Sequence, residues 1–315
     1  MTRTRFAFAF LTSTCLAVSA LAWDANAHKV VATIAYDTLK STRPDVQAWA
    51  DSVIAGNEAG YNTFVDSATY ADWLKRSAPN GWPPITHDGR FTQWHFIDYP
   101  IYDDQVAVGT PVPPVKVATN SLIYGLPLLE NSSYGLPAGK NLALIIHLVG
   151  DAHQPLHCAT WCTSHAASAW KGDTGGNDFA LTYKAGAIRI TELHDLWDKA
   201  ISIKYGLVTE HESDAMLAGV ATQIEGNCPI SSFGGKEKDL DLVDWTLESY
   251  ERAFNQAYRP HDPATILADP YIANMEDTAE KRVALAGYRL ANLLIAIHDH
   301  ALPGTTKKKK KKGQG

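Results

Sequence analysis

Cysteine is scarce in this chain of 315 residues, which contains four. A chain of this length can bury a sizeable core, so its fold does not depend on a dense disulfide framework. After Cys15, the remaining Cys158, Cys162 and Cys228 form an odd set, and one disulfide with one free thiol is the simplest arrangement. The sequence does not decide which two pair. A metal cluster at Cys158 and Cys162 is a less favoured reading, because an oxidising compartment favours a bridge.

Long hydrophobic runs are also missing beyond the first 22 residues. No later segment approaches the roughly twenty apolar residues that cross a bilayer, which argues against membrane insertion. The N-terminal stretch MTRTRFAFAFLTSTCLAVSALA combines two arginines, a short apolar run and small residues at Ala20 and Ala22. This pattern predicts a secretory signal peptide, residues 1–22, cut between Ala22 and Trp23. We therefore expect a secreted protein, extracellular or periplasmic, that is a monomer.

Positive charge is in deficit, with a formal net charge of −6. Arg3 and Arg5 belong to the leader and Lys307–Lys312 to the polar tail, so the body is more acidic still. Proteins that grip long duplex DNA through many phosphates are usually basic. Any nucleic-acid activity here must use a small local site with bound cations. The Lys-rich tail, residues 304–315, is expected to be disordered, and an inert tail is favoured over one that steers polyanions.

The remaining pattern is mainly helical. Apolar residues recur at threes and fours over 28–40, 44–55, 65–78, 115–130, 140–154, 193–204, 209–225, 241–258 and 276–300. Only 172–191 is typical of a strand pair, with a Gly-Gly-Asn loop leading into it. No domain boundary is evident between 23 and 303. We predict an all-α fold: one compact multi-helix domain with a small β-hairpin.

The stretch HLVGDAHQPLH, residues 147–157, places three histidines and an aspartate on the most apolar helix of the chain. Ionisable groups inside such a helix are costly unless they are paired or bound to a metal. His147 and Asp151 are four residues apart and project from one helical face. Pro155 limits the helix, so His157 can approach from beyond it. His153 lies off that face and is expected to be structural.

Three further motifs provide possible partners. LHDLWD again places a histidine and an aspartate, His194 and Asp198, four apart on a helix. WHFIDYP adds His95 among aromatic residues, and ATYADWLKR places Asp72 where an apolar residue was expected. Taken singly, each His–Asp motif is as compatible with a buried hydrogen-bonded pair as with a metal site, and Asp72 with a helix-surface charge. Two such pairs together with His157 favour metal binding.

The predicted mature N-terminus, WDANAH, begins at Trp23 and reaches His28 five positions later. A free α-amino group and its neighbouring carbonyl can together chelate a metal ion. The amine must be deprotonated, and its unperturbed pKa near 8 makes that accessible.

Together these motifs resemble the secreted type I nucleases, zinc-dependent single-strand-specific enzymes of the phospholipase C/nuclease superfamily. The N-terminal Trp with His five later, ADWLK, WHFID, HLVGDAHQPLH, GGN and HDLWD occur in family order between Trp23 and Asp198. The resemblance implies an endonuclease that cuts single-stranded DNA and RNA to 5′-phosphorylated products, with 3′-nucleotidase activity, and places a type I nuclease domain at 23–303.

The resemblance also implies three zinc ions held in a cleft by nine residues. Asp72, His95, His147 and Asp151 would hold the first ion. Trp23, through its amino nitrogen and carbonyl oxygen, and His28 would hold a second, which Asp151 bridges to the first. The third would be held by His157, His194 and Asp198. Asp72 would orient a metal-activated hydroxide for attack on phosphorus.

Four further residues match positions where the family contacts substrate. Lys75 would face phosphate, although an ordinary surface lysine is the alternative. Phe96 would stack on an unpaired base and Asp98 would accept from its edge; the alternatives are a core aromatic and a loop cap. Asn177 of the GGN motif is first a turn residue and would also lie near phosphate.

Two rivals remain open. A zinc phospholipase C of the same superfamily also begins with Trp, but typically has a longer gap to the first His and a Glu in the final pair. A secreted zinc-scavenging or structural zinc protein would have closed sites with four protein ligands each. The proposed third site has three, which leaves room for water or phosphate.

Overall fold

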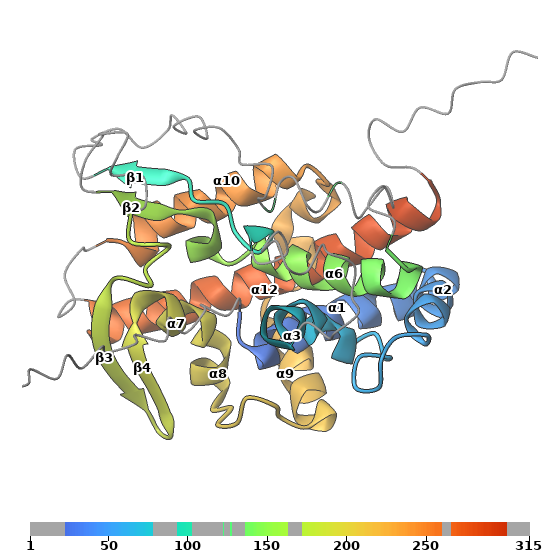
Figure 1. Ribbon diagram of the computed structural model, residues 1–315, viewed down its shortest axis with the longest axis horizontal. Coiled ribbons are helices and arrows are strands. Elements are labelled where there is room, and N and C mark those ends of the chain that lie inside the picture. Colours follow the sequence, from blue (N-terminus) through green and yellow to red (C-terminus); the bar gives the residue numbers. More distant parts are fainter. Residues whose placement is uncertain are drawn as a thin grey trace, which may run out of the picture.

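The computed structural model describes residues 23–77, 93–102, 122, 127, 136–162, 172–259 and 266–300. The expected signal peptide, the helix predicted over 115–130 except Leu122 and Pro127, the sequon Asn131-Ser132-Ser133 and the Lys-rich tail lie outside these residues. The fold of the described part is mostly helical, as expected, with two small sheets (Figure 1).

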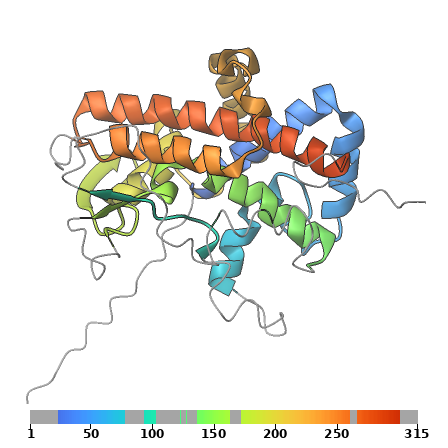
Figure 2. The ribbon, with the colours of Figure 1, turned by 90° about the horizontal axis from the view of Figure 1, so that it is seen from above.

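Three helices form the frame that carries the site. Helix α12, Asp269–His298, runs along the length of the molecule beside α1, Ala25–Thr42, with α6, Ala138–Asp151, packed against both (Figures 1 and 2). Most side chains between these helices are apolar and buried, and the buried polar exceptions include His28 and His147. The close approach of α1 and α12 needs Gly287, because a Cβ there would lie 2.6 Å from Cβ of Ile34.

The remaining helices surround this frame. They are α2, Pro44–Ile54; α3, Tyr70–Ser77, preceded by the 3-10 turn Asp66–Thr69; α7, Leu193–Asp198; α8, Ala200–Tyr205; α9, Asp214–Asn227; and α10, Leu242–Arg252. Short 3-10 turns occupy Ile230–Phe233 and Lys236–Lys238, and a π-turn, Ala253–Ala257, extends α10. Side-chain caps explain several starts: Asp24 accepts from the N–H of Ala27 at 2.9 Å, and Ser213 caps α9.

The predicted hairpin is present. Strand β3, Ala180–Ala185, pairs antiparallel with β4, Ile188–Glu192. A second pair was not predicted: β1, Pro100–Tyr102, and β2, Thr160–Cys162, run parallel. Three-residue strands are too short to show alternation. Parallel strands also need a long crossover, so no local turn signal marks them.

Two other expectations need correction. The helix predicted over 193–204 is two helices, because the chain departs from helical geometry at Lys199 (φ −93°, ψ 8°) between α7 and α8. The disulfide expected among Cys158, Cys162 and Cys228 is not formed, and all three thiols are buried and free. The Sγ atoms of Cys158 and Cys162 instead lie 3.8 Å and 3.9 Å from the carbonyl oxygens of Ala152 and Thr160.

No helix of the described residues has the length and apolar character needed to span a membrane.

Candidate metal centre

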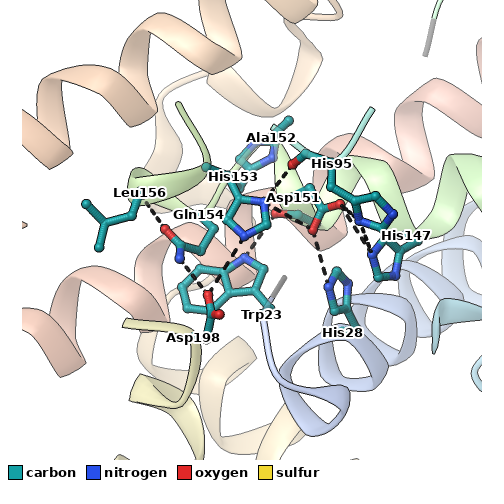
Figure 3. Close-up of polar contacts among 12 residues, drawn as sticks. Trp23, His28, His95, His147, Asp151, Ala152, His153, Gln154, Leu156 and Asp198 are labelled. Carbon is teal, nitrogen blue, oxygen red and sulfur yellow. Dashed lines mark hydrogen bonds and ion pairs between the residues drawn. The ribbon is translucent and has the colours of Figure 1, made fainter. Parts of the chain in front are cut away.

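Helix α6 presents His147 and Asp151, two of its three ionisable residues, to the interior of the molecule. His147 and Asp151 are both fully buried, among apolar neighbours that include Leu148 and Val149. The Nε2 of His147 lies 3.3 Å from Oδ2 of Asp151, as the four-residue spacing predicts. The apolar face of α6 is therefore core, and the polar pair is built into that core (Figure 3).

His95 and Asp72 reach this pair from other segments. Nδ1 of His95 lies 2.9 Å from Oδ2 of Asp151 and 3.1 Å from Nε2 of His147. Oδ1 of Asp72, on α3, lies 3.8 Å from Nε2 of His147. The structure thus brings together the four residues predicted for the first ion.

His28 completes one side of the cluster. Its ring stacks on that of His147, with centroids 3.8 Å apart, and its Nε2 lies 3.4 Å from Oδ1 of Asp151. His28 reaches Asp151 because residue 150 is glycine: a Cβ there would lie 2.8 Å from Nδ1 of His28. The indole of the buried Trp23 donates to the carbonyl of Gly150 at 3.0 Å, which places the predicted mature N-terminus beside α6.

The second cluster joins the turn after α6 to α7. His157, in the 3-10 turn Pro155–Cys158, has its Nε2 3.2 Å from Nε2 of His194 and 3.9 Å from Oδ1 of Asp198. Oδ2 of Asp198 lies 3.4 Å from Nε2 of His194. The N–H of Asp24 donates to the carbonyl of Asp198, so Trp23 lies between the two clusters.

Hydrogen bonds to backbone carbonyls fix three of these imidazoles. Nδ1 of His147 lies 2.6 Å from the oxygen of Ala68, Nδ1 of His157 2.6 Å from that of His95, and Nδ1 of His194 2.7 Å from that of Gly175. A neutral imidazole that donates from Nδ1 has a bare lone pair on Nε2. Such carbonyl contacts commonly orient histidines that bind metal ions.

The donor atoms of the two clusters are placed as metal ligands would be. In the second cluster Nε2 of His157 and Nε2 of His194 lie 3.2 Å apart, and two imidazoles that carry their hydrogens on Nδ1 can share a cation at such a position. In the first, the ring nitrogens of His28 and the carboxylate oxygens of Asp151 are buried without a hydrogen bond of good geometry from any described residue, and the close contacts of Asp151 given above are ion pairs with histidines. Histidine nitrogen and carboxylate oxygen are the donor types that zinc takes in proteins.

The local electrostatics agree with this fit. Burial raises the pKa of Asp151, but the imidazoles of His147 and His95 outweigh burial and hold the pKa well below its usual value. Burial raises the pKa of Asp198 well above its usual value, against the hydrogen bond from Gln154. A buried carboxylate with so little compensation favours a nearby cation. Burial also lowers the pKa of His28, which keeps it in the neutral form that a ligand needs.

Three groups of ligand atoms, each lying within 4.8 Å of one another, result among the described residues. They are His28, Asp72 and His147; His95, His147 and Asp151; and His157, His194 and Asp198. The last two match the predicted groupings. The first group places His28 with Asp72 and His147. The family resemblance instead implied that His28 and Trp23 hold a second ion, which Asp151 bridges to the first. The His28–Asp151 contact is nevertheless present.

The GGN segment forms a turn behind His194. Gly175 and Gly176 have φ of +68° and +86°, and a Cβ on Gly175 would lie 2.6 Å from the carbonyl oxygen of Leu156. The side chain of Asn177 donates to the carbonyl of Thr174 at 2.6 Å. The predicted turn role of Asn177 is therefore present.

The other predicted substrate residues lie just after His95. Phe96 is half-buried and Asp98 is exposed. Although Asp98 as a residue is exposed, burial of its carboxyl by the surrounding protein and the charge of the nearby Asp173 raise its pKa to about 7. At neutral pH this carboxyl can therefore donate as well as accept. Lys75 lies on α3, and its side chain is outside the described residues.

Sequence reasoning missed one residue that contacts the ligands directly. Gln154 donates from Nε2 to Oδ1 of Asp198 at 2.6 Å, while its Oε1 accepts from the N–H of Leu156 (Figure 3). Its place between two histidines in HQPLH was a usable signal. His153, expected to be structural, is buried and lies outside all three ligand groups.

The sequence from 23 to 299 matches the family described as S1/P1 nuclease. The chain belongs to the S1/P1 nuclease family. Nuclease S1 of Aspergillus oryzae is 26% identical over 87% of this chain and 91% of its own length. Nuclease P1 of Penicillium citrinum is 23% identical over 88% of this chain and 98% of its own. Endonuclease 4 of Arabidopsis thaliana is 30% identical over 162 residues, and the chain spans about half the length of that relative.

Proposed function

We propose that this member of the S1/P1 nuclease family is a secreted zinc-dependent endonuclease. Its substrates are the phosphodiester bonds of single-stranded DNA and RNA, its products carry 5′-phosphates, and it also hydrolyses 3′-nucleotides. The observation that carries the proposal is the 3.2 Å separation of Nε2 of His157 from Nε2 of His194 beside Asp198, next to a second buried cluster of the same donor types.

Nine residues would hold three zinc ions: Trp23, His28, Asp72, His95, His147, Asp151, His157, His194 and Asp198. Trp23 would contribute its free amine and carbonyl once the leader is removed between Ala22 and Trp23. The support is the position of Trp23 between the two clusters. Zinc ions held by these residues would make water more acidic near neutral pH and would stabilise charge on phosphate oxygens.

The chain's own residues would orient the reactants. Asp72, whose Oδ1 lies 3.8 Å from Nε2 of His147 in the first cluster, would orient the attacking hydroxide toward phosphorus. Lys75 lies one turn further along α3 and would contact the phosphate. The half-buried Phe96 would stack on an unpaired base, Asp98 would hydrogen-bond its edge, and Asn177 would lie near phosphate. Stacking of this kind needs a base that is not paired, which favours single strands.

The first test uses protein processed to begin at Trp23. Release of acid-soluble nucleotides from single-stranded and duplex DNA would be followed before chelation, after chelation and after zinc is restored. We expect activity on the single strand, loss with chelator and recovery with zinc. The variant Asp72→Asn should lose at least a hundredfold in kcat, because it removes a carboxylate that would hold metal and orient the nucleophile.

The matched control is Asp277→Asn on α12, whose exposed carboxylate pairs with Lys204 and takes no part in the clusters. It should keep full activity. Hydrolysis of phosphatidylcholine without cleavage of single-stranded DNA would assign a phospholipase C activity instead. Zinc binding without hydrolysis of any phosphodiester would assign a zinc-scavenging or structural role.

A further inference from the structure

We propose that a buried cluster of Arg282, Glu248 and Arg289 positions the turn that sets the spacing between the two groups of metal ligands. The proposal rests on the metal binding in the proposed function. The turn comprises Ala152, His153 and Gln154, between Asp151 of the first cluster and His157 of the second.

This turn links both clusters directly. It begins at Ala152, directly after Asp151 at the end of α6. Oδ1 of Asp151 lies 3.6 Å from Nδ1 of His157. Gln154, its last residue, donates to Asp198. A displacement of the turn would therefore move ligands of both clusters relative to each other.

Helices α10 and α12 hold the carbonyl groups of the turn. Arg282 donates from Nε to the carbonyl of His153 at 3.1 Å, and Ser249 donates from its hydroxyl to the carbonyl of Ala152 at 2.7 Å. Arg282 also donates from Nη2 to Oγ of Ser249 at 2.6 Å, which joins the two contacts. These carbonyls lie directly after the C-terminus of α6. A cation at that position also interacts favourably with the helix dipole.

Arg289 holds the side chain of the turn. Its Nη1 lies 3.0 Å from Nε2 of His153, while Nδ1 of His153 lies 2.8 Å from the carbonyl of Val149. A guanidinium can only donate, so Nε2 of His153 accepts and Nδ1 carries the hydrogen. The ring is thereby tied at one end to α6 and at the other to α12.

Glu248 pairs with both cations, and Oδ2 of Asp239 lies 3.7 Å from Nη2 of Arg289. Oε2 of Glu248 accepts from Nη1 of Arg282 at 2.9 Å and from Nη1 of Arg289 at 2.8 Å. Both arginines are buried, Arg289 completely. Buried ion clusters contribute little net stability compared with well-packed apolar side chains, whereas their directional bonds define a geometry. The bonds of this cluster converge on one turn, so we assign it a positioning role.

The test compares Arg282→Lys and Ser249→Ala with the wild-type protein. Lysine keeps the charge but loses the fork that reaches both His153 and Ser249. Ser249→Ala removes one hydroxyl and is the milder change. Each protein, loaded with zinc, is dialysed against buffered chelator, and the zinc left per chain is measured. We expect Arg282→Lys to bind zinc about tenfold more weakly than wild type, so that it loses zinc at a lower chelator concentration. A tenfold loss is the smaller end of the range seen when residues that support metal ligands are changed.

The matched control is Thr278→Val on α12. It also removes one buried hydroxyl, which donates to Oε1 of Gln256 at 2.9 Å and touches neither cluster nor turn. Thermal unfolding of the metal-free proteins gives the purely structural cost of each change. The proposal is supported if Ser249→Ala and Arg282→Lys release zinc more readily than Thr278→Val at comparable metal-free stability.

Equal zinc retention in all three variants would overturn the proposal and leave the cluster with a structural role alone. Should Arg282→Lys fail to fold, Ser249→Ala decides the question. Zinc retention does not depend on hydrolysis. A wild-type protein that binds zinc but cleaves no nucleic acid would refute the nuclease activity while leaving this test valid.

Discussion

At the scale of single residues, the most informative position has no side chain. Gly150 lies in the last turn of α6 between two ligands of the first cluster, and its missing Cβ is the space that His28 occupies. Ala has a higher helix propensity than Gly, so propensity alone would favour alanine here. The close packing of His28 excludes alanine, because its Cβ would lie 2.8 Å from Nδ1 of that ring.

Gly150→Ala should therefore destabilise the protein and displace the His28 ring from Asp151. We expect weaker zinc binding at this cluster together with a lower unfolding temperature, measured by zinc titration and calorimetry. The control is Gly219→Ala on α9, where nothing lies within 4 Å of the added Cβ. That change should stabilise the fold by about 0.5–1 kcal/mol. A stabilised Gly150→Ala variant with full zinc content would contradict the role given to His28.

The closeness of His147 to Asp151, and of His194 to Asp198, could be predicted from the sequence for a physical reason. A carboxylate or histidine on an apolar helical face is expensive, so such four-residue spacings stand out against their surroundings. Gln154 and Arg289 were not predictable in the same way. Their contacts join residues whose proximity is decided by tertiary packing rather than by local spacing.

At the scale of secondary-structure elements, the link between α10 and α12 is electrostatic. Burial raises the pKa of Glu248, but hydrogen bonds from Arg289 and the charges of both arginines outweigh burial and lower the pKa to about 2. A carboxyl with a lowered folded-state pKa stabilises the fold above its unfolded pKa. That stability is lost as pH falls through the folded value.

Glu248→Gln should consequently cost about 3 kcal/mol at pH 7, from the pKa difference between the folded and unfolded states. The difference from wild type should shrink between about pH 4.5 and pH 2, where the wild-type carboxyl also becomes protonated. Urea unfolding of both metal-free proteins at several pH values measures it. A difference that stays constant down to pH 2 would show that packing, and not charge, is responsible.

Elements of different kinds were predictable to different degrees. Long amphipathic helices such as α1 and α12 carry many turns of the same pattern, so their existence follows from the sequence. The start of α12 was predicted at 276, seven residues after its actual start at Asp269. The parallel pair β1–β2 is stabilised by contacts between distant segments, including the bond from the N–H of Ile97 to the carbonyl of His157, so its short strands carry no local signal.

At the scale of the whole molecule, the clusters join segments that are far apart in the chain. His28 lies on α1, His147 on α6 and Asp198 on α7, and the cluster that supports their turn lies on α10 and α12. Metal binding is therefore linked to the global stability of the fold. An ion that binds only the native state adds free energy of unfolding by mass action.

Removal of metal should lower the unfolding temperature substantially. A single ion present at a thousandfold excess over its Kd contributes about 4 kcal/mol. For a domain of this size that corresponds to roughly 10 °C. Calorimetry with zinc and with excess chelator tests this, and magnesium serves as the control ion because histidine-rich sites bind it poorly. An unchanged unfolding temperature would mean that no ion is bound by the native state.

The spread of the ligands along the chain has a consequence for biogenesis. Between Trp23 and Asp198 the chain must close several long loops before the donors meet, and each closure costs entropy that later contacts must offset. A polypeptide still being synthesised and short of Asp198 lacks a complete second cluster. A fully metallated molecule would therefore be one whose folding is complete from α1 to α7, and its metal content can serve as a check on the quality of the folded protein.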